Sequence, residues 1–174
     1  MDTSSTRRRF FRTAGGVSLA AVATTAAAPP VSATGLGSQT TDGTIEPGPA
    51  TDLVQRFCTA WSRLDAAELG AFFTEDATYR NIPIPGVCSG REAIQEALAG
   101  QIQVLQYTTL TVQSAVSWQN TVIATRIDSF RYTNSDHDVD LPIVGVFQLT
   151  PDFLYFTSWV DYFDLAQSEF ETVG

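Results

Sequence analysis

The sequence has no lysine, one histidine and two cysteines. All ten of its basic residues are therefore arginines, and four of these lie within the first twelve positions. The chain also lacks an apolar run able to span a bilayer, because the segment from Thr13 to Ala28 is too short and too polar. Its 174 residues, 44% of them hydrophobic and 11% aromatic, are enough for one domain with a core and too few for two ordinary domains.

The first residues have the pattern of an export signal. The stretch "TRRRFFR" at 6–12 resembles the twin-arginine signal, in which Ser or Thr precedes an arginine pair that apolar residues and a basic residue follow. A weakly apolar run comes next, and "VSA" at 31–33 has the small residues that a signal peptidase recognises. We expect residues 1–33 to be a twin-arginine signal peptide cleaved after Ala33, with "AAA" at 26–28 as a second cleavage site. The mature protein would then be exported from a prokaryotic cytoplasm to the periplasm or the medium. A disordered basic tail that matches the motif by chance is the alternative.

The chain is strongly acidic once residues 1–33 are removed. Six arginines remain against eighteen Asp and Glu residues, a net charge of −12. Such a surface repels nucleic acid and anionic lipid. We therefore expect no nucleic-acid partner and, after signal cleavage, no membrane partner.

The cysteines, the histidine and one acidic segment are weak candidates for redox or metal chemistry. Cys58 falls in a helical pattern and Cys88 in a loop, so a disulfide is geometrically conceivable in an oxidising compartment, and two free thiols are the other interpretation. His137 lies in a polar turn and is expected to be exposed. The segment "DHDVD" at 136–140 imitates the start of a calcium loop but lacks its glycine and its distal Glu, so we expect no metal site.

The hydrophobic pattern predicts helices first and strands after. Residues 34–49 are rich in Gly, Thr, Ser and Pro and are typical of a flexible linker, which leaves residues 50–174 as the domain. Asp52 is a candidate N-cap of an amphipathic helix, and two more helices are predicted at 66–73 and 89–102. Strands joined by short turns are predicted at 108–118, 121–132, 139–150 and 153–164, with a shorter one at 77–82. This order predicts an α+β fold, in which a curved antiparallel or mixed sheet wraps around about three N-terminal helices.

Three of the predicted strands carry polar pairs at positions i and i+2, which project to the same face. The pairs are Tyr79 with Asn81, Arg126 with Asp128, and Trp159 with Asp161. Ion pairs on a solvated face are one interpretation of the charged residues. Large apolar residues on the same faces, Phe130 and Phe163 among them, favour burial instead, because a polar group between apolar neighbours is usually buried and hydrogen-bonded. We therefore predict a polar site inside the sheet, with Phe130 and Phe163 lining its pocket.

The segments around these pairs resemble one enzyme family. "YRNIPIPGVCSGREAI", "TRIDSF", "VDLPIVGVFQL" and "WVDYFDL" are similar, in this order, to limonene-1,2-epoxide hydrolases, over residues 52–165. That family has the cone-shaped NTF2-like fold, which ketosteroid isomerases and SnoaL-type polyketide cyclases share. The resemblance implies a small lipophilic epoxide and water as partners, no cofactor, and a homodimer formed through the outer face of the sheet.

The resemblance also implies a role for each polar residue. In this family an Asp–Arg–Asp triad adds water to an epoxide in one step and gives a vicinal diol. Its general acid, bridging arginine and general base correspond to Asp128, Arg126 and Asp161. The residues that hold the water and border the epoxide correspond to Tyr79, Asn81 and Trp159. Two other functions stay open: an isomerase or cyclase of the same fold, and a non-catalytic binder of hydrophobic small molecules.

Epoxide opening at neutral pH suits one protonated and one ionised carboxyl group. To keep an Asp protonated at pH 7, its pKa must rise by roughly three units, or about 4 kcal/mol. Burial and a second carboxylate raise the pKa of such a group, whereas Arg126 lowers it. With both carboxyls ionised the triad carries a charge of −1, and one added proton makes it neutral, so the pair is expected to titrate as a unit.

Overall fold

The computed structural model describes residues 43–82 and 84–168, and the structural statements that follow concern these residues. The predicted signal peptide over residues 1–33 lies outside them, as does the part of the predicted linker from 34 to 42. Within the described ranges, no helix is long and apolar enough to cross a membrane.

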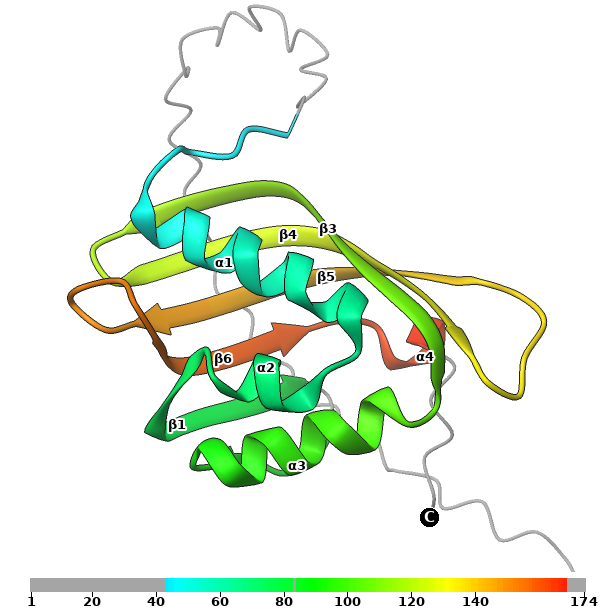
Figure 1. Ribbon diagram of the computed structural model, residues 1–174. Helices are drawn as coiled ribbons and strands as arrows, with labels where there is room; N and C mark the ends of the chain where they lie inside the picture. The colour runs from blue at the N-terminus through cyan, green and yellow to red at the C-terminus, as the bar shows by residue number, and fades with distance from the viewer. Residues whose placement is uncertain (1–42, 83, 169–174) are drawn as a thin grey trace, which may run out of the picture. The chain divides into compact units, whose positions relative to one another are not determined.

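Six strands form one sheet in the order β2-β1-β6-β5-β4-β3 (Figure 1). Their bounds are β1 Phe73–Ile82, β2 Cys88–Ser89, β3 Leu105–Trp118, β4 Thr121–Tyr132, β5 Val139–Leu149 and β6 Phe156–Tyr162. From β3 to β6, consecutive strands pair antiparallel, which confirms the predicted meander. Strand β1 pairs parallel with β6, so the sheet is mixed. Register shifts interrupt the pairing of β3 with β4, and such bulges bend a sheet.

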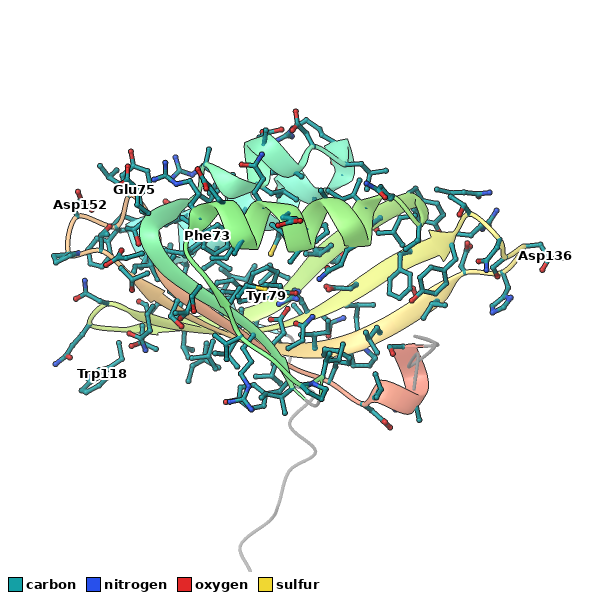
Figure 2. All side chains as sticks on the ribbon, turned by 90° about the horizontal axis from the view of Figure 1, so that it is seen from below. Phe73, Glu75, Tyr79, Trp118, Asp136 and Asp152 are labelled. Carbon is teal, nitrogen blue, oxygen red and sulfur yellow. The ribbon has the colours of Figure 1, made fainter. Side chains whose placement is uncertain are left out.

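Helices lie over one face of this sheet in both views (Figures 1 and 2). The helical segments are α1 Pro49–Ala60, the 3₁₀ turn η1 Trp61–Arg63, α2 Ala66–Gly70, α3 Arg91–Ile102 and the short α4 Leu165–Ser168. The buried residues of α1 recur at helical spacing, so its apolar side faces the sheet. This arrangement confirms the predicted α+β fold with a curved mixed sheet.

Two predicted helix ends are wrong. The first helix starts at Pro49 with Gly48 as its N-cap, not at Asp52, because proline suits a first turn whose N–H groups have no helical acceptor. The second helix ends at Gly70 and does not reach Phe73. Phe73 is fully buried and begins β1 instead, where it pairs with Phe156 of β6.

Residues 44–46, at the end of the predicted linker, run along β3. Ile45 forms a bridge with Ala115, and the Glu46 amide donates a hydrogen bond of 2.9 Å to the Ala115 carbonyl. Ile45 is partly buried against the main core. This part of the linker therefore packs on the domain.

The core has an aromatic centre and a second apolar cluster. Phe57 of α1 is fully buried, and its ring meets six others edge-on, at centroid distances of 5.0 to 6.3 Å. Pairs of this geometry each contribute about 0.5–1.5 kcal/mol beyond the burial of their area. The second cluster lies on β4 and β5 and contains Phe130, Val139, Leu141 and Ile143. The aromatic centre fixes α1 against β1, β5 and β6.

Both cysteines are free thiols, so the structure has no disulfide between Cys58 and Cys88. Cys58 is buried in α1, and Cys88 is partly buried in β2. Burial raises the pKa of the Cys58 thiol to about 12, although Arg126 opposes the shift. Cys58 therefore remains protonated and is a poor nucleophile.

Candidate active site

A cavity of about 70 Å³ lies where the two apolar clusters meet. All eight residues predicted for the site line it: Tyr79, Asn81, Arg126, Asp128, Phe130, Trp159, Asp161 and Phe163. In Figure 2, Tyr79 lies in the interior between the helices and the sheet, whereas Trp118, Asp136 and Asp152 lie at the outer tips. The structure therefore brings the three predicted same-face pairs into one cavity.

The strand register sets the neighbours within the site. In the parallel pairing of β1 with β6, Tyr79 lies opposite Trp159 and Asn81 lies opposite Asp161. Because side chains alternate along a strand, both pairs project from the helix-covered face. Arg126 and Asp128 reach the same space from β4, two strands away from β6.

Arg126 is the centre of a buried ion cluster. Its Nε donates to Asp128 Oδ1 over 2.7 Å, and its Nη2 donates to Asp128 Oδ2 over 3.2 Å. Toward β6, its Nη1 and Nη2 donate to Asp161 Oδ1 and Oδ2 over 2.9 and 2.5 Å. The side chains of Arg126 and Asp161 are 1% and 4% exposed, whereas Asp128 keeps 13%. One guanidinium thus holds two carboxyl groups in fixed positions, with Asp128 the more accessible.

A glycine on the intervening strand lets the guanidinium reach β6. Gly145 of β5 pairs with Ala124 on one side and with Asp161 on the other. A Cβ atom at this position would lie 2.7 Å from Nη1 of Arg126 and 3.0 Å from Oδ1 of Asp161. The inward residues of β5 otherwise have side chains, and here the guanidinium occupies that space. Gly145 is therefore a positioning residue for the cluster.

Trp159 and Tyr79 form the wall beside Asp161. The indole Nε1 of Trp159 donates to Asp161 Oδ1 over 2.7 Å, so Asp161 accepts three hydrogen bonds. The Trp159 ring stacks on Tyr79 with centroids 4.3 Å apart, and the Arg126 guanidinium lies 5.8 Å from its centroid. Both contacts fix the orientation of the indole.

Tyr79 carries its hydroxyl into a polar corner of the cavity. The Gln101 side chain of α3 donates to this oxygen over 3.2 Å, and Asn81 also hydrogen-bonds to it. Burial and the charge of Asp161 raise the pKa of Tyr79. The phenol therefore stays protonated and can donate a hydrogen bond to a bound water or substrate.

Asp128 and Arg126 have shifted pKa values for different reasons. Burial raises the pKa of Asp128 from its ordinary 3.8 to about 6, with Arg126 opposing the rise and Asp161 adding to it. Burial by itself would lower the pKa of Arg126, but the charges of Asp161 and Asp128 raise it well above its ordinary value. Arg126 is thus always charged, whereas Asp128 takes up and releases a proton near pH 6, well above the range of an ordinary aspartate.

The described residues contain no group of three His, Cys, Asp or Glu side chains placed to hold a metal ion. His137 is exposed in the turn between β4 and β5, where its Nδ1 lies 2.9 Å from the Ser135 hydroxyl. The cluster itself joins the two carboxylates to a guanidinium, which occupies the place that a cation would take.

Sequence reasoning missed three residues that shape the site. Gln101 of α3 contacts the Tyr79 hydroxyl, Trp61 of η1 lines the cavity, and Gly145 adjoins Arg126. The glycine had a readable signal, since it interrupts the inward apolar positions of "VDLPIVGVFQL" and a glycine inside a strand marks close approach of another group. Gln101 and Trp61 had none, because helical polar and aromatic residues are ordinary.

Comparison with known proteins gives the fold family. A family model described as a SnoaL-like domain matches residues 54–152. A protein with a ketosteroid isomerase-like fold from Catenulispora acidiphila has a TM-score of 0.62 and 22% identity, over 69% of this chain and 94% of that chain. An LEH-like epoxide hydrolase from M. tuberculosis has a TM-score of 0.59 and 21% identity, over 68% and 85%. An NTF2-like protein of unknown function from Burkholderia pseudomallei has a TM-score of 0.62 and 13% identity, over 70% and 95%. These similarities confirm the predicted NTF2-like fold.

Proposed function

The chain belongs to the family of SnoaL-like domains, and from this premise we propose that it is a cofactor-independent epoxide hydrolase of the limonene-1,2-epoxide hydrolase type. The observation that carries the proposal is the Arg126 guanidinium shared between Asp128 and Asp161 at the wall of the cavity. Apolar side chains form much of the remaining wall, including Phe130, Leu141 and Phe163. A lipophilic epoxide suits this lining.

Water would be activated on the β1 and β6 side of the cavity. A carboxylate offers about four acceptor positions, and Asp161 uses three of them for Arg126 and Trp159. The fourth is free to accept a hydrogen bond from water, with Tyr79 and Asn81 close by to orient it. Holding the water in place before the reaction lowers the entropic part of the barrier.

Ring opening would then proceed in one step. The water oxygen forms a bond to an epoxide carbon while its proton moves to Asp161, and the C–O bond on that carbon breaks. The proton of Asp128 moves to the epoxide oxygen, so the product is a neutral vicinal diol. Asp161 has gained one proton and Asp128 has lost one, and exchange with solvent restores both. The raised pKa of Asp128 supports its role as the acid.

A ketosteroid isomerase or a polyketide cyclase would use the same cavity differently. The protonated phenol of Tyr79 favours such a reaction, since it could donate a hydrogen bond to an enolate oxygen. An arginine bound to both carboxyl groups has no part in a proton transfer between carbon atoms. Epoxide hydrolysis accounts for all three members of the cluster.

Hydrolysis in oxygen-18 water tests the proposal. The domain over residues 34–174 is incubated with limonene oxide and bulkier epoxides, together with Asp128→Asn and Asp161→Asn. We expect a diol with one labelled oxygen from the wild type and at least a 100-fold slower reaction in both variants. Folded protein that leaves every epoxide unchanged, or binds one tightly without turnover, would support an isomerase, a cyclase or a binding protein instead.

We also propose export by the twin-arginine pathway and assembly as a homodimer. The outer face of the sheet supports the dimer, because it exposes Val116, Ile123, Val144 and Tyr162. N-terminal sequencing of protein recovered outside the cytoplasm tests the first proposal, and cleavage elsewhere than after residue 33 or 28 would contradict the predicted site. Sedimentation of the mature domain tests the second, with a monomer at micromolar concentration as the contrary result.

A further inference from the structure

Gln101, near the end of α3, brings a side-chain amide to the wall of the cavity. Its Nε2 donates a hydrogen bond of 3.2 Å to the hydroxyl oxygen of Tyr79, and Asn81 of β1 hydrogen-bonds to the same oxygen. Burial and the charge of Asp161 raise the pKa of Tyr79, and the hydrogen bonds from Gln101 and Asn81 oppose this rise, as donation to a phenol oxygen does. Two amide groups therefore donate to one hydroxyl.

These two donors determine what the Tyr79 hydroxyl can still do. A phenol oxygen carries one proton and can accept hydrogen bonds on its lone pairs. With the lone pairs engaged by amides, its own proton remains, and no residue in the described ranges accepts that proton. Asp161 lies opposite Asn81 on the neighbouring strand β6. A molecule between the phenol and this carboxylate would have to accept from the first and donate to the second, as a water molecule can.

We propose that Gln101 is a positioning residue that fixes the direction in which Tyr79 donates its proton. Because an amide N–H of Gln101 faces the phenol oxygen, the hydroxyl proton cannot turn toward α3 and points to a water molecule at Asp161 instead. The water then accepts from Tyr79 and donates to Asp161, which leaves one of its lone pairs to attack the epoxide carbon. This inference rests on the proposed function for its effect on the rate, but not for the direction of the hydrogen bond itself.

Two substitutions of similar size test the direction of this hydrogen bond. Gln101→Met removes the donor, so kcat for limonene oxide should fall about 10-fold while KM changes less than about 2-fold. Gln101→Glu, when ionised, accepts the phenol proton and turns it away from the water, so kcat at about pH 8 should fall about 100-fold. The protonated carboxyl can donate again, so the ratio of variant to wild-type kcat should rise as the pH falls. A ratio that stays constant from about pH 4 to 8 would overturn the proposal.

A double-mutant cycle shows whether these effects pass through Tyr79. In Tyr79→Phe, which has no hydroxyl, either substitution of Gln101 should change kcat by less than about 2-fold. An equal loss with and without the hydroxyl would mean that Gln101 acts by packing or charge alone, and would overturn the proposal. The cycle with Gln101→Met decides the matter by itself if Gln101→Glu does not fold. Gln103→Met is the control and should leave kcat unchanged, because Gln103 is exposed directly after α3.

An NMR measurement that needs no turnover separates failure of this inference from failure of the proposed function. Carbon-13 at Cζ of the five tyrosines gives five signals, and the one lost in Tyr79→Phe is that of Tyr79. This signal moves downfield when a phenol becomes a stronger donor, so at about pH 8 Gln101→Glu should shift it further downfield than Gln101→Met does. Equal shifts in the two variants would overturn the proposed direction. The expected shifts in a protein that hydrolyses no epoxide would support the contact and count against the proposed function alone.

Discussion

Gly145→Ala should damage the ion cluster through a single added methyl group. The new Cβ would lie 2.7 Å from Nη1 of Arg126 and 2.7 Å from the Phe147 ring, whereas carbon contacts are favourable near 3.5–4.0 Å. The guanidinium must therefore move by roughly 0.7 Å or more, which weakens its hydrogen bonds to Asp161. Overpacking of a core costs about 1–3 kcal/mol, and a broken buried ion pair costs about 3–5 kcal/mol.

We expect Gly145→Ala to lower the free energy of unfolding by about 2–4 kcal/mol in urea titrations. Under the proposed function, kcat should fall about 100-fold, because a displacement near 1 Å in a reacting constellation has an effect of that size. Gly100→Ala is a matched control, since Gly100 is an exposed position of α3 with open space around it. That variant should be more stable by about 0.5–1 kcal/mol with unchanged kcat.

Adding Phe147→Leu to Gly145→Ala separates the two contacts. Relief of the ring contact should restore part of the stability, whereas kcat should stay low because Nη1 of Arg126 remains displaced. A Gly145→Ala protein with wild-type stability and wild-type kcat would show that the added methyl group does not displace the guanidinium. Recovery of kcat in the double variant would assign the effect to Phe147 and not to the guanidinium.

Three other variants test the electrostatics and the core. Between pH 4 and 6 the folded protein keeps a proton on Asp128 that the unfolded chain has released, so this group's contribution to stability falls with rising pH, by roughly 3 kcal/mol in total. The difference in unfolding free energy between wild type and Asp128→Asn should therefore change between pH 4 and 6, and a difference that stays constant over this range would contradict the expectation. Hydrolysis by the wild type should slow above pH 6, where Asp128 loses its proton. Arg126→Lys should lose about 3 kcal/mol of stability, because a lysine cannot hold both carboxyl groups bidentately, and calorimetric melting at wild-type temperature would argue against that. Phe57→Ala should cost about 3–5 kcal/mol in denaturant titrations, and a loss under 1 kcal/mol would mean that its six ring contacts matter little.

The sequence predicted the strands better than the helix ends. Alternation of apolar and polar residues gave β4 at its observed bounds, because each inward position from Val122 to Phe130 faces the helices. The start of α1 depended on a backbone feature at Gly48 and Pro49 that competes with the usual capping signal of Asp52. The residues just before Phe73 form a helix, so the sequence pattern extends that helix to Phe73. Only the pairing of Phe73 with Phe156 of β6 makes it a strand residue.

The members of the candidate site were predictable from strand spacing, whereas the bridge from Arg126 to Asp161 was expected only from the family resemblance. The i, i+2 spacing placed Arg126 beside Asp128, but nothing local indicated that the guanidinium also reaches Asp161 across β5. That contact depends on the order of strands in the sheet and on the missing side chain at Gly145. The same holds for Gln101, since its contact with Tyr79 depends on how α3 lies against β1.

The parallel pairing of β1 with β6 also bears on how the protein folds. Strands β3 to β6 join through short turns, so their pairing can proceed between neighbours in the chain. Tyr79 and Asn81 meet Trp159 and Asp161 only when β1 docks on β6, which closes a loop of some eighty residues, as in the Thr78–Ser158 contact. Closing a long loop carries an entropic cost that near-neighbour hairpins avoid. The side of the cavity that we propose binds water is thus completed by the longest-range pairing of the sheet. A chain halted before that step would hold its guanidinium and carboxylates with no phenol or amide beside them.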